Sequence, residues 1–170
     1  VASEVQLTLF DGITSEQLDQ AVIQAALQNV KDDPDFDKIA ANLLLKTIYK
    51  RVLGNYTSED ELRKLHESKF ADYLKYGVKH GLLDERLVDT KLFDIKKIAK
   101  ALDPSRDKLS KYLGVITNKN RYALREGSGE PIEVPQFTHM RIAMGLSLNS
   151  KNPTESALDF YYHMSNLHYV

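Results

Sequence analysis

Apolar residues recur at three- and four-residue steps through most of this chain, which is the spacing of helices with one buried face. Polar and charged residues fill the positions between them. Turn-forming glycine, proline, asparagine and aspartate residues separate the periodic segments. The pattern predicts helices over about 14–30, 33–54, 58–81, 95–102, 109–114, 137–146 and 155–166.

Two of these helices begin with a sequence signature for N-terminal capping. Thr14 is followed three residues later by Gln17, and Ser58 is followed three residues later by Glu61. In such a capping box, each side chain of the pair hydrogen-bonds the backbone N–H of the other residue. Gly54 is the C-terminal stop of the second predicted helix, since glycine favours the left-handed conformation that ends a helix. These residues at the helix ends therefore support the helices that the apolar spacing predicts.

One stretch has a different period. Tyr122 and Leu124, and later Ile132 and Val134, alternate with polar neighbours as in a strand with one buried face. Two glycines and a proline between the two segments favour a turn. The stretch predicts a short β-hairpin over about 121–134. The predicted fold is therefore all-α, a compact helical bundle with this one small hairpin.

Composition narrows the class of protein. The chain has 170 residues, of which 42% are hydrophobic and 28% charged, as in ordinary globular proteins. The net charge is −1 and the basic residues are scattered, so we expect neither nucleic acid nor an anionic membrane as partner. No apolar run approaches the length of a membrane-spanning helix and no leader peptide is recognisable, so we expect a cytoplasmic protein.

Histidine spacing argues against a metal centre. The chain has no cysteine, which excludes disulfides, thiolate metal ligands and cysteine nucleophiles within these residues. Its histidines are His66, His80, His139, His163 and His168, and none has a second histidine three or four residues away. We expect them at the surface or half-buried.

Other candidates for chemistry have simpler interpretations. Acidic runs at 32–35 and 59–61 lie where helices begin, and carboxylates are favoured there by the helix dipole. No phosphate-binding glycine motif and no nucleophile elbow occurs. Tyr161 and Tyr162 are interpreted as packing residues with their hydroxyls at the surface. The sequence therefore yields no catalytic, cofactor-binding or metal-binding residue.

Several segments of the chain form a recognisable series: RYALR (121–125), GEPIEVPQ (129–136), RIA (141–143), YLGVITN (112–118), IAANLLL (39–45) and IYKRVLG (48–54). Together they resemble the large subunit of ribonucleotide reductase. In that family, the hairpin links an all-helical N-terminal region to the catalytic barrel. The resemblance therefore places this chain in the N-terminal, all-helical part of a large subunit.

The first helix adds a second likeness. DGITSEQLDQAVIQAA (11–26) is similar to the last helix of the family's ATP cone. The resemblance divides the chain into 1–54, the last part of a cone-like segment with the helix after it, and 55–170, the helical domain with the hairpin. Asn42 stands where the family more often has arginine. The earlier half of a cone, with its nucleotide contacts, has no counterpart in these residues.

The resemblance also implies a function. The family converts ribonucleotides to deoxyribonucleotides through a cysteine thiyl radical, with a thioredoxin-like reductant and nucleotide effectors. Its radical comes from a small partner subunit in class I or from adenosylcobalamin in class II. Because this chain has no cysteine, we expect it to be structural and regulatory, to lie against the catalytic barrel, and not to be catalytic alone. The reductase class, and a diphosphate or triphosphate substrate, stay open.

Three arginines around the predicted hairpin have two interpretations. Arg121, Arg125 and Arg141 either pair with acidic groups of the barrel or make local pairs with Glu130 or Glu133. Local pairs at a surface contribute little stability.

Two other functions stay open from the sequence. A free-standing helical interaction module would fit the self-sufficient caps and stops. The apolar ending at 167–170 favours a fragment of a longer protein instead. A nucleotide-binding regulator built on the 14–30 helix is the third alternative, and it requires affinity for dATP.

Overall fold

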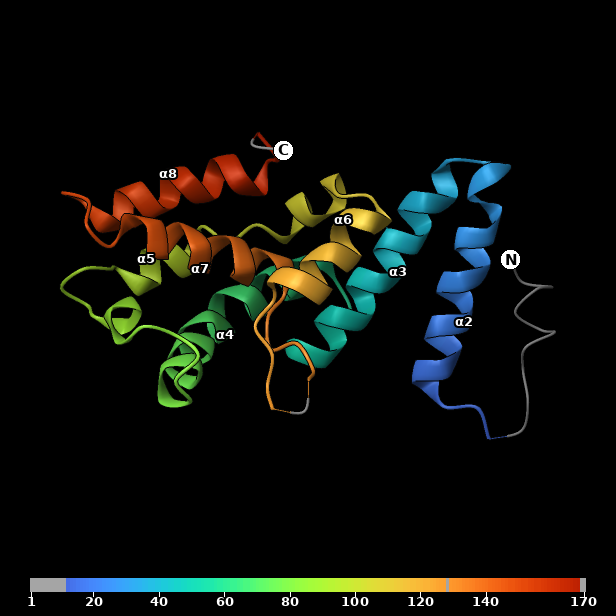
Figure 1. The fold of residues 1–170 in the computed structure, drawn as a ribbon, viewed down its shortest axis with the longest axis horizontal. Helices are drawn as coiled ribbons and strands as arrows, with labels where there is room; N and C mark the ends of the chain where they lie inside the picture. Colours follow the sequence, from blue (N-terminus) through green and yellow to red (C-terminus); the bar gives the residue numbers. More distant parts are fainter. Residues whose placement is uncertain (1–11, 128, 169–170) are drawn as a thin grey trace.

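The computed structural model describes residues 12–127 and 129–168, and within them the fold is all-α, as predicted (Figure 1). Its α-helices are α2 (Ser15–Gln28), α3 (Asp35–Val52), α4 (Glu59–Lys79), α5 (Ile95–Lys100), α6 (Tyr112–Thr117), α7 (Pro135–Ser147) and α8 (Pro153–Ser165). Short 3-10 turns are η1 (Asn29–Lys31), η2 (Glu85–Val88) and η3 (Pro104–Leu109), and η4 (Asn118–Tyr122) is a π-helical turn. Residues 1–11 of the predicted cone-like segment lie outside the described residues. Among the described helices, none combines the length and the apolar character needed to span a bilayer.

Helices α2 and α3 form an antiparallel pair at one end of the molecule (Figure 1). The predicted capping box opens α2: Gln17 N donates to Thr14 Oγ1 at 3.2 Å, and Thr14 N donates to Gln17 Oε1 at 2.9 Å. Ile23 of α2 is buried in the core, which is worth about 1.5–3 kcal/mol for a side chain of this size. Gly54 ends α3 with φ of +96°, a conformation that favours glycine.

The second predicted capping box is half formed. Glu61 N donates to Ser58 Oγ at 3.2 Å, so Ser58 caps α4 as expected. The Glu61 carboxylate accepts from Thr57 N instead, one residue earlier than a capping box requires.

An aromatic cluster holds the centre of the core between α4 and α7. The Phe137 ring lies 5.2 Å from Phe70 and 5.0 Å from Tyr73, between ring centroids. Helices α7 and α8 form an antiparallel pair in which Ala143 and Ala157 are fully buried. Small side chains here let the two backbones approach closely.

The β-hairpin predicted over 121–134 is wrong. The chain does reverse direction there, but the described residues form only one isolated bridge, Arg125 to Pro131, and no strand. Two features prevent a ladder. Pro131 has no N–H to donate, and the N–H of Leu124 donates to the side chain of Glu133. The segment 123–134 is called the connecting loop below.

The helix predicted over 109–114 is also misplaced. Leu109 belongs to η3, and Gly114 lies inside α6 rather than at its end. The helix continues past Gly114 because Val115 is buried and Ile116 packs against the core. Apolar burial outweighs the weak helix propensity of one glycine.

Candidate functional site

A fully buried carboxylate, that of Glu133, gathers four donors from α4, α7 and the connecting loop. Arg141 Nε donates to it at 2.7 Å, Thr138 Oγ1 at 2.9 Å and Leu124 N at 3.0 Å, and the Tyr73 hydroxyl donates as well. The Glu133 side chain has no exposed surface, and that of Arg141 is 19% exposed. This group is called the Glu133 cluster. It replaces the strand pairing that the sequence predicted.

Charge balance keeps the Glu133 cluster intact. Burial lowers the pKa of Arg141, but the interactions with Glu133 and Tyr73 together raise it above its ordinary value, so the guanidinium stays charged. Burial and the neighbouring Glu133 both raise the pKa of Tyr73, so its hydroxyl stays protonated and donates. The cluster is therefore a neutral ion pair with added donors, the arrangement that makes buried charges tolerable.

The three arginines around the predicted hairpin have different surroundings in the structure. Arg141 makes a local pair with Glu133, but this pair is buried and not at the surface. Arg125 donates to the backbone carbonyls of Lys119, at 2.7 Å, and of Gly129. Arg121 is exposed. The expected contacts with a barrel stay a prediction.

A second buried chain of hydrogen bonds connects α3, η3, α7 and α8. Asp107 accepts from Tyr49 Oη at 2.5 Å and from Gln136 Nε2 at 2.6 Å. The Tyr161 hydroxyl donates to Gln136 Oε1 and accepts from Asp103 N at 2.9 Å. This group is called the Asp107 cluster. The expectation that the Tyr161 hydroxyl lies at the surface is thus wrong, because the residue is only 2% exposed and its hydroxyl bonds Gln136 and Asp103 N inside the protein.

Burial raises the pKa of the Asp107 carboxyl to about 7, although hydrogen bonds from Tyr49 and Gln136 act in the opposite direction. A group with such a pKa exchanges protons near neutral pH, as a general acid or base must. Asp107, however, is only 3% exposed. Its two oxygens are occupied by hydrogen bonds from Tyr49 and Gln136, an arrangement that suits a structural role.

His66 departs from the expectation of an exposed or half-buried histidine. It is fully buried between Tyr49 and Phe137, with ring centroids 5.5 and 5.7 Å away. Its Nδ1 lies 2.8 Å from Leu62 O, while Nε2 has no partner in the structure. Burial lowers the pKa of His66 to about 4, so the ring is neutral at pH 7.

The remaining histidines follow the expectation: His139 and His163 are half-buried, and His80 and His168 are exposed. Within residues 12–127 and 129–168, no three histidine or carboxylate side chains converge as a metal centre requires.

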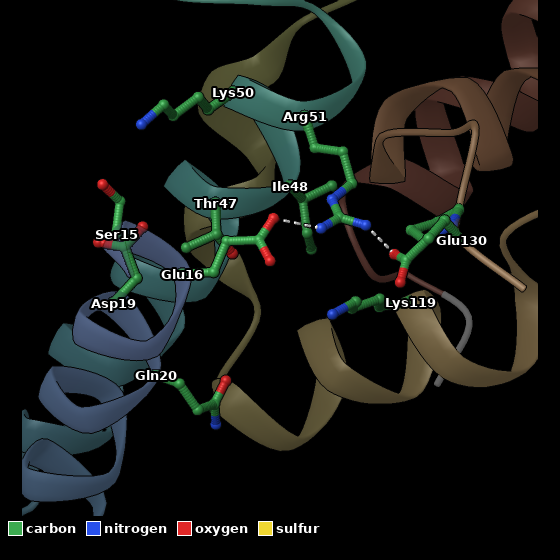
Figure 2. A pocket seen from close by; sticks show the side chains of 11 residues that line it. Ser15, Glu16, Asp19, Gln20, Thr47, Ile48, Lys50, Arg51, Lys119 and Glu130 are labelled. Carbon is green, nitrogen blue, oxygen red and sulfur yellow. Dashed lines mark hydrogen bonds and ion pairs between the residues drawn. The ribbon is translucent and has the colours of Figure 1, made fainter. Parts of the chain in front are cut away.

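An open pocket of about 600 Å³ lies where α2, α3, η4 and the connecting loop meet (Figure 2). Arg51 stands at its centre and pairs with Glu16 on one side and Glu130 on the other. A second pocket of about 590 Å³ shares Arg51 and Glu130 in its lining. The 600 Å³ pocket is called the Arg51 groove. Its lining contains three acidic and three basic side chains: Glu16, Asp19, Glu130, Lys50, Arg51 and Lys119.

Comparison with known proteins identifies the family. A family profile described as "Ribonucleotide reductase, all-alpha domain" matches residues 108–170. The ribonucleoside-diphosphate reductase subunit alpha of Chlamydia trachomatis is 35% identical over 161 residues, covering 95% of this chain and 15% of that protein. Residues 108–170 therefore belong to the ribonucleotide reductase all-alpha domain family, and the similarity to reductase large subunits extends over nearly the whole chain.

Other reductase alpha subunits are also similar to this chain. The alpha subunit of Helicobacter pylori is 31% identical over 159 residues, covering 93% of this chain and 19% of that protein. The alpha subunit of Enterobacteria phage T4 is 28% identical over 141 residues, covering 81% and 18%. The chain therefore spans less than a fifth of the length of these reductase subunits.

The matched reductase domain contains most of the Glu133 cluster. Glu133 and Gln136 both lie in the GEPIEVPQ segment, where alternation assigned Glu133 to the solvent side. Both side chains are buried and hydrogen-bonded instead. The sequence offered no direct signal for either cluster, because Tyr73 and Tyr49 are 60 and 58 residues from their partners.

Proposed function

We propose that this chain is the helical N-terminal portion of a ribonucleoside-diphosphate reductase large subunit. The complete enzyme converts ribonucleotides to deoxyribonucleotides for DNA synthesis by thiyl-radical chemistry. The names of the reductase subunits that the chain resembles support a diphosphate substrate. Within that enzyme, this portion contributes structure and regulation, and the catalytic cysteines come from the rest of the subunit.

The two buried clusters carry this proposal. They connect four helices and the connecting loop through side chains that are almost fully enclosed. Hydrogen bonds to charged groups are worth about 1.5–3 kcal/mol each, and a satisfied polar network fixes one arrangement of its helices. Helices fixed in this way suit the role of a rigid wall against a catalytic barrel, because reacting groups must be held in constant positions.

The proposal assigns partners outside this segment. The catalytic barrel of the same chain contacts the helical wall, and a thioredoxin-like protein supplies electrons. A radical-generating small subunit or adenosylcobalamin supplies the radical. We assign both radical sources to parts of the enzyme outside this segment. We place this enzyme in the cytoplasm.

Residues 1–54 form the regulatory part of the proposal. We assign α2 to the end of an ATP cone and α3 to the helix after it. Nucleotide effectors then act on the full enzyme through the cone, and α2 transmits its movement to the helical body. The position of α2 at one end of the molecule, packed on α3, supports this assignment (Figure 1).

Turnover measurements test the proposal. A full-length subunit that contains this segment, supplied with a radical source and a dithiol reductant, is expected to reduce ribonucleoside diphosphates. The 170-residue chain under the same conditions is expected to give no product. Product formed by the isolated chain would overturn this division of labour.

A further inference from the structure

Helix α2 is attached to the body of the protein through few elements. It packs on α3 and on η1, the turn that links the two helices. Because α2 and α3 are antiparallel, the first turn of α2 lies beside the last turn of α3. Glu16 is in that first turn and Arg51 is in that last turn. Each is favoured there by the dipole of its own helix.

Arg51 uses two different nitrogens for two different elements. Its Nη2 donates to Glu16 Oε1 at 2.7 Å, and its Nη1 pairs with Glu130 Oε2 in the connecting loop. Figure 2 shows the guanidinium between the two carboxylates. A planar guanidinium binds two acceptors in fixed directions, whereas a lysine ammonium is a point charge on a flexible stem. One side chain thus connects α2 to the loop.

The loop end of this connection leads into the Glu133 cluster. Glu130 O accepts from Glu126 N at 3.0 Å, and Ile132 N donates to Leu124 O at 2.9 Å. The next residue is Glu133, whose carboxylate accepts from Leu124 N. A change in the position of Glu130 therefore acts on backbone that is directly bonded to the buried cluster.

We propose that Arg51 couples α2 to the connecting loop, so that displacement of the α2 first turn loosens the loop. When Glu16 moves away, Arg51 loses one of two carboxylates that fix its position, and its hold on Glu130 weakens. By reciprocity, a change at Glu130 alters the stability of the α2 first turn. This inference rests on the proposed function for its role, since α2 is there the end of the regulatory cone, and it specifies the residue that relays the movement.

Hydrogen exchange read by mass spectrometry tests the coupling in the 170-residue chain and in a longer protein that contains it. In Glu16→Ala, exchange of backbone amides in the connecting loop is expected to accelerate about two- to fivefold, the range of an exposed ion pair. Asp19→Ala is the matched control. Asp19 is an acidic residue of the same helix that lines the same groove, and no ion pair joins it to Arg51 in the structure. Its loop exchange should equal that of the wild type.

The Arg51→Lys background identifies the route. With lysine at this position, Glu16→Ala should no longer change loop exchange, because lysine cannot hold both carboxylates in fixed directions. Unchanged loop exchange in Glu16→Ala overturns the proposal, and so does an acceleration that persists with Arg51→Lys. An equal acceleration in α8 also overturns it, since that result indicates general destabilisation. These readouts are independent of turnover, so failure of the coupling and failure of the reductase assignment are distinguishable.

Discussion

Replacing Glu133 by glutamine tests whether the Glu133 cluster fixes α4, α7 and the connecting loop. Glutamine has the same shape but no charge, and it presents an NH₂ group to a site whose neighbours are donors. Arg141, with a side chain only 19% exposed, is left as a charge without its partner. At least one of the donors from Tyr73, Thr138 and Leu124 then faces another donor.

The expected loss is large compared with the stability of a domain. Removing one member of a buried ion pair costs about 3–5 kcal/mol, because the other charge stays buried. A domain of this size is typically stable by about 5–15 kcal/mol. Tyr73→Phe should cost less, about 1.5–3 kcal/mol, since it removes one hydrogen bond to the carboxylate and leaves the ion pair.

Urea unfolding at pH 7, followed by circular dichroism, measures both losses from the midpoint and slope. Glu155→Gln is the control, because it breaks the Lys97–Glu155 pair, whose side chains are 50% and 61% exposed, and should cost less than about 1 kcal/mol. If the free energy of unfolding of Glu133→Gln lay within about 1 kcal/mol of the wild-type value, the reasoning that this cluster fixes the helices would be refuted.

Three further predictions concern buried acid–base groups and glycine. The folded-state pKa of Asp107, about 7, lies above its ordinary value of 3.8, so only the folded state holds this proton between those pH values. The stability of the wild type relative to Asp107→Asn should therefore rise by up to about 1.4 kcal/mol per pH unit as the pH falls from 7 to 5. The pKa of His66 is lowered from 6.5 to about 4, so His66 contributes stability above pH 6.5 that is lost as the pH falls toward 4. Urea titrations across this pH range should show that His66→Leu loses less unfolding free energy on acidification than the wild type does. The same pH dependence in both proteins would contradict the assignment. Gly77→Ala should lower the thermal midpoint despite better helix propensity, because a Cβ there meets Leu83 Cδ1 at 2.5 Å. Gly145→Ala, in open space, should raise stability by about 0.5–1 kcal/mol, and equal effects of the two substitutions would refute the packing argument.

Local features of the fold could be predicted from the sequence because their partners are close in the chain. Thr14 and Gln17 are three residues apart, so residue types alone identify the cap. Apolar spacing gave the positions of the long helices for the same reason. The predicted helix end at Gly114 was wrong, because the low helix propensity of one glycine is a weak effect and the burial of Val115 favours continuing the helix.

The polar interior could not be predicted in this way. Alternation around Glu133 suggested an exposed carboxylate in a hairpin, and only the meeting of Tyr73 and Arg141 in space makes its burial favourable. Tyr161 was misassigned for the same reason, since its partner Gln136 lies on another helix. A single sequence contains no signal for contacts of this separation. The Arg51 groove likewise depends on four segments, α2, α3, η4 and the connecting loop, that come together only in the fold.

We propose that this chain is the structural, helical portion of a ribonucleoside-diphosphate reductase. The most direct test is ribonucleotide reduction by the full-length protein that contains it, with a radical source and a dithiol reductant, beside the same assay on the 170-residue chain. Deoxyribonucleotide product is expected from the full-length protein and none from the chain alone. Product from the isolated chain, or a full-length protein that reduces no ribonucleoside diphosphate, would contradict it.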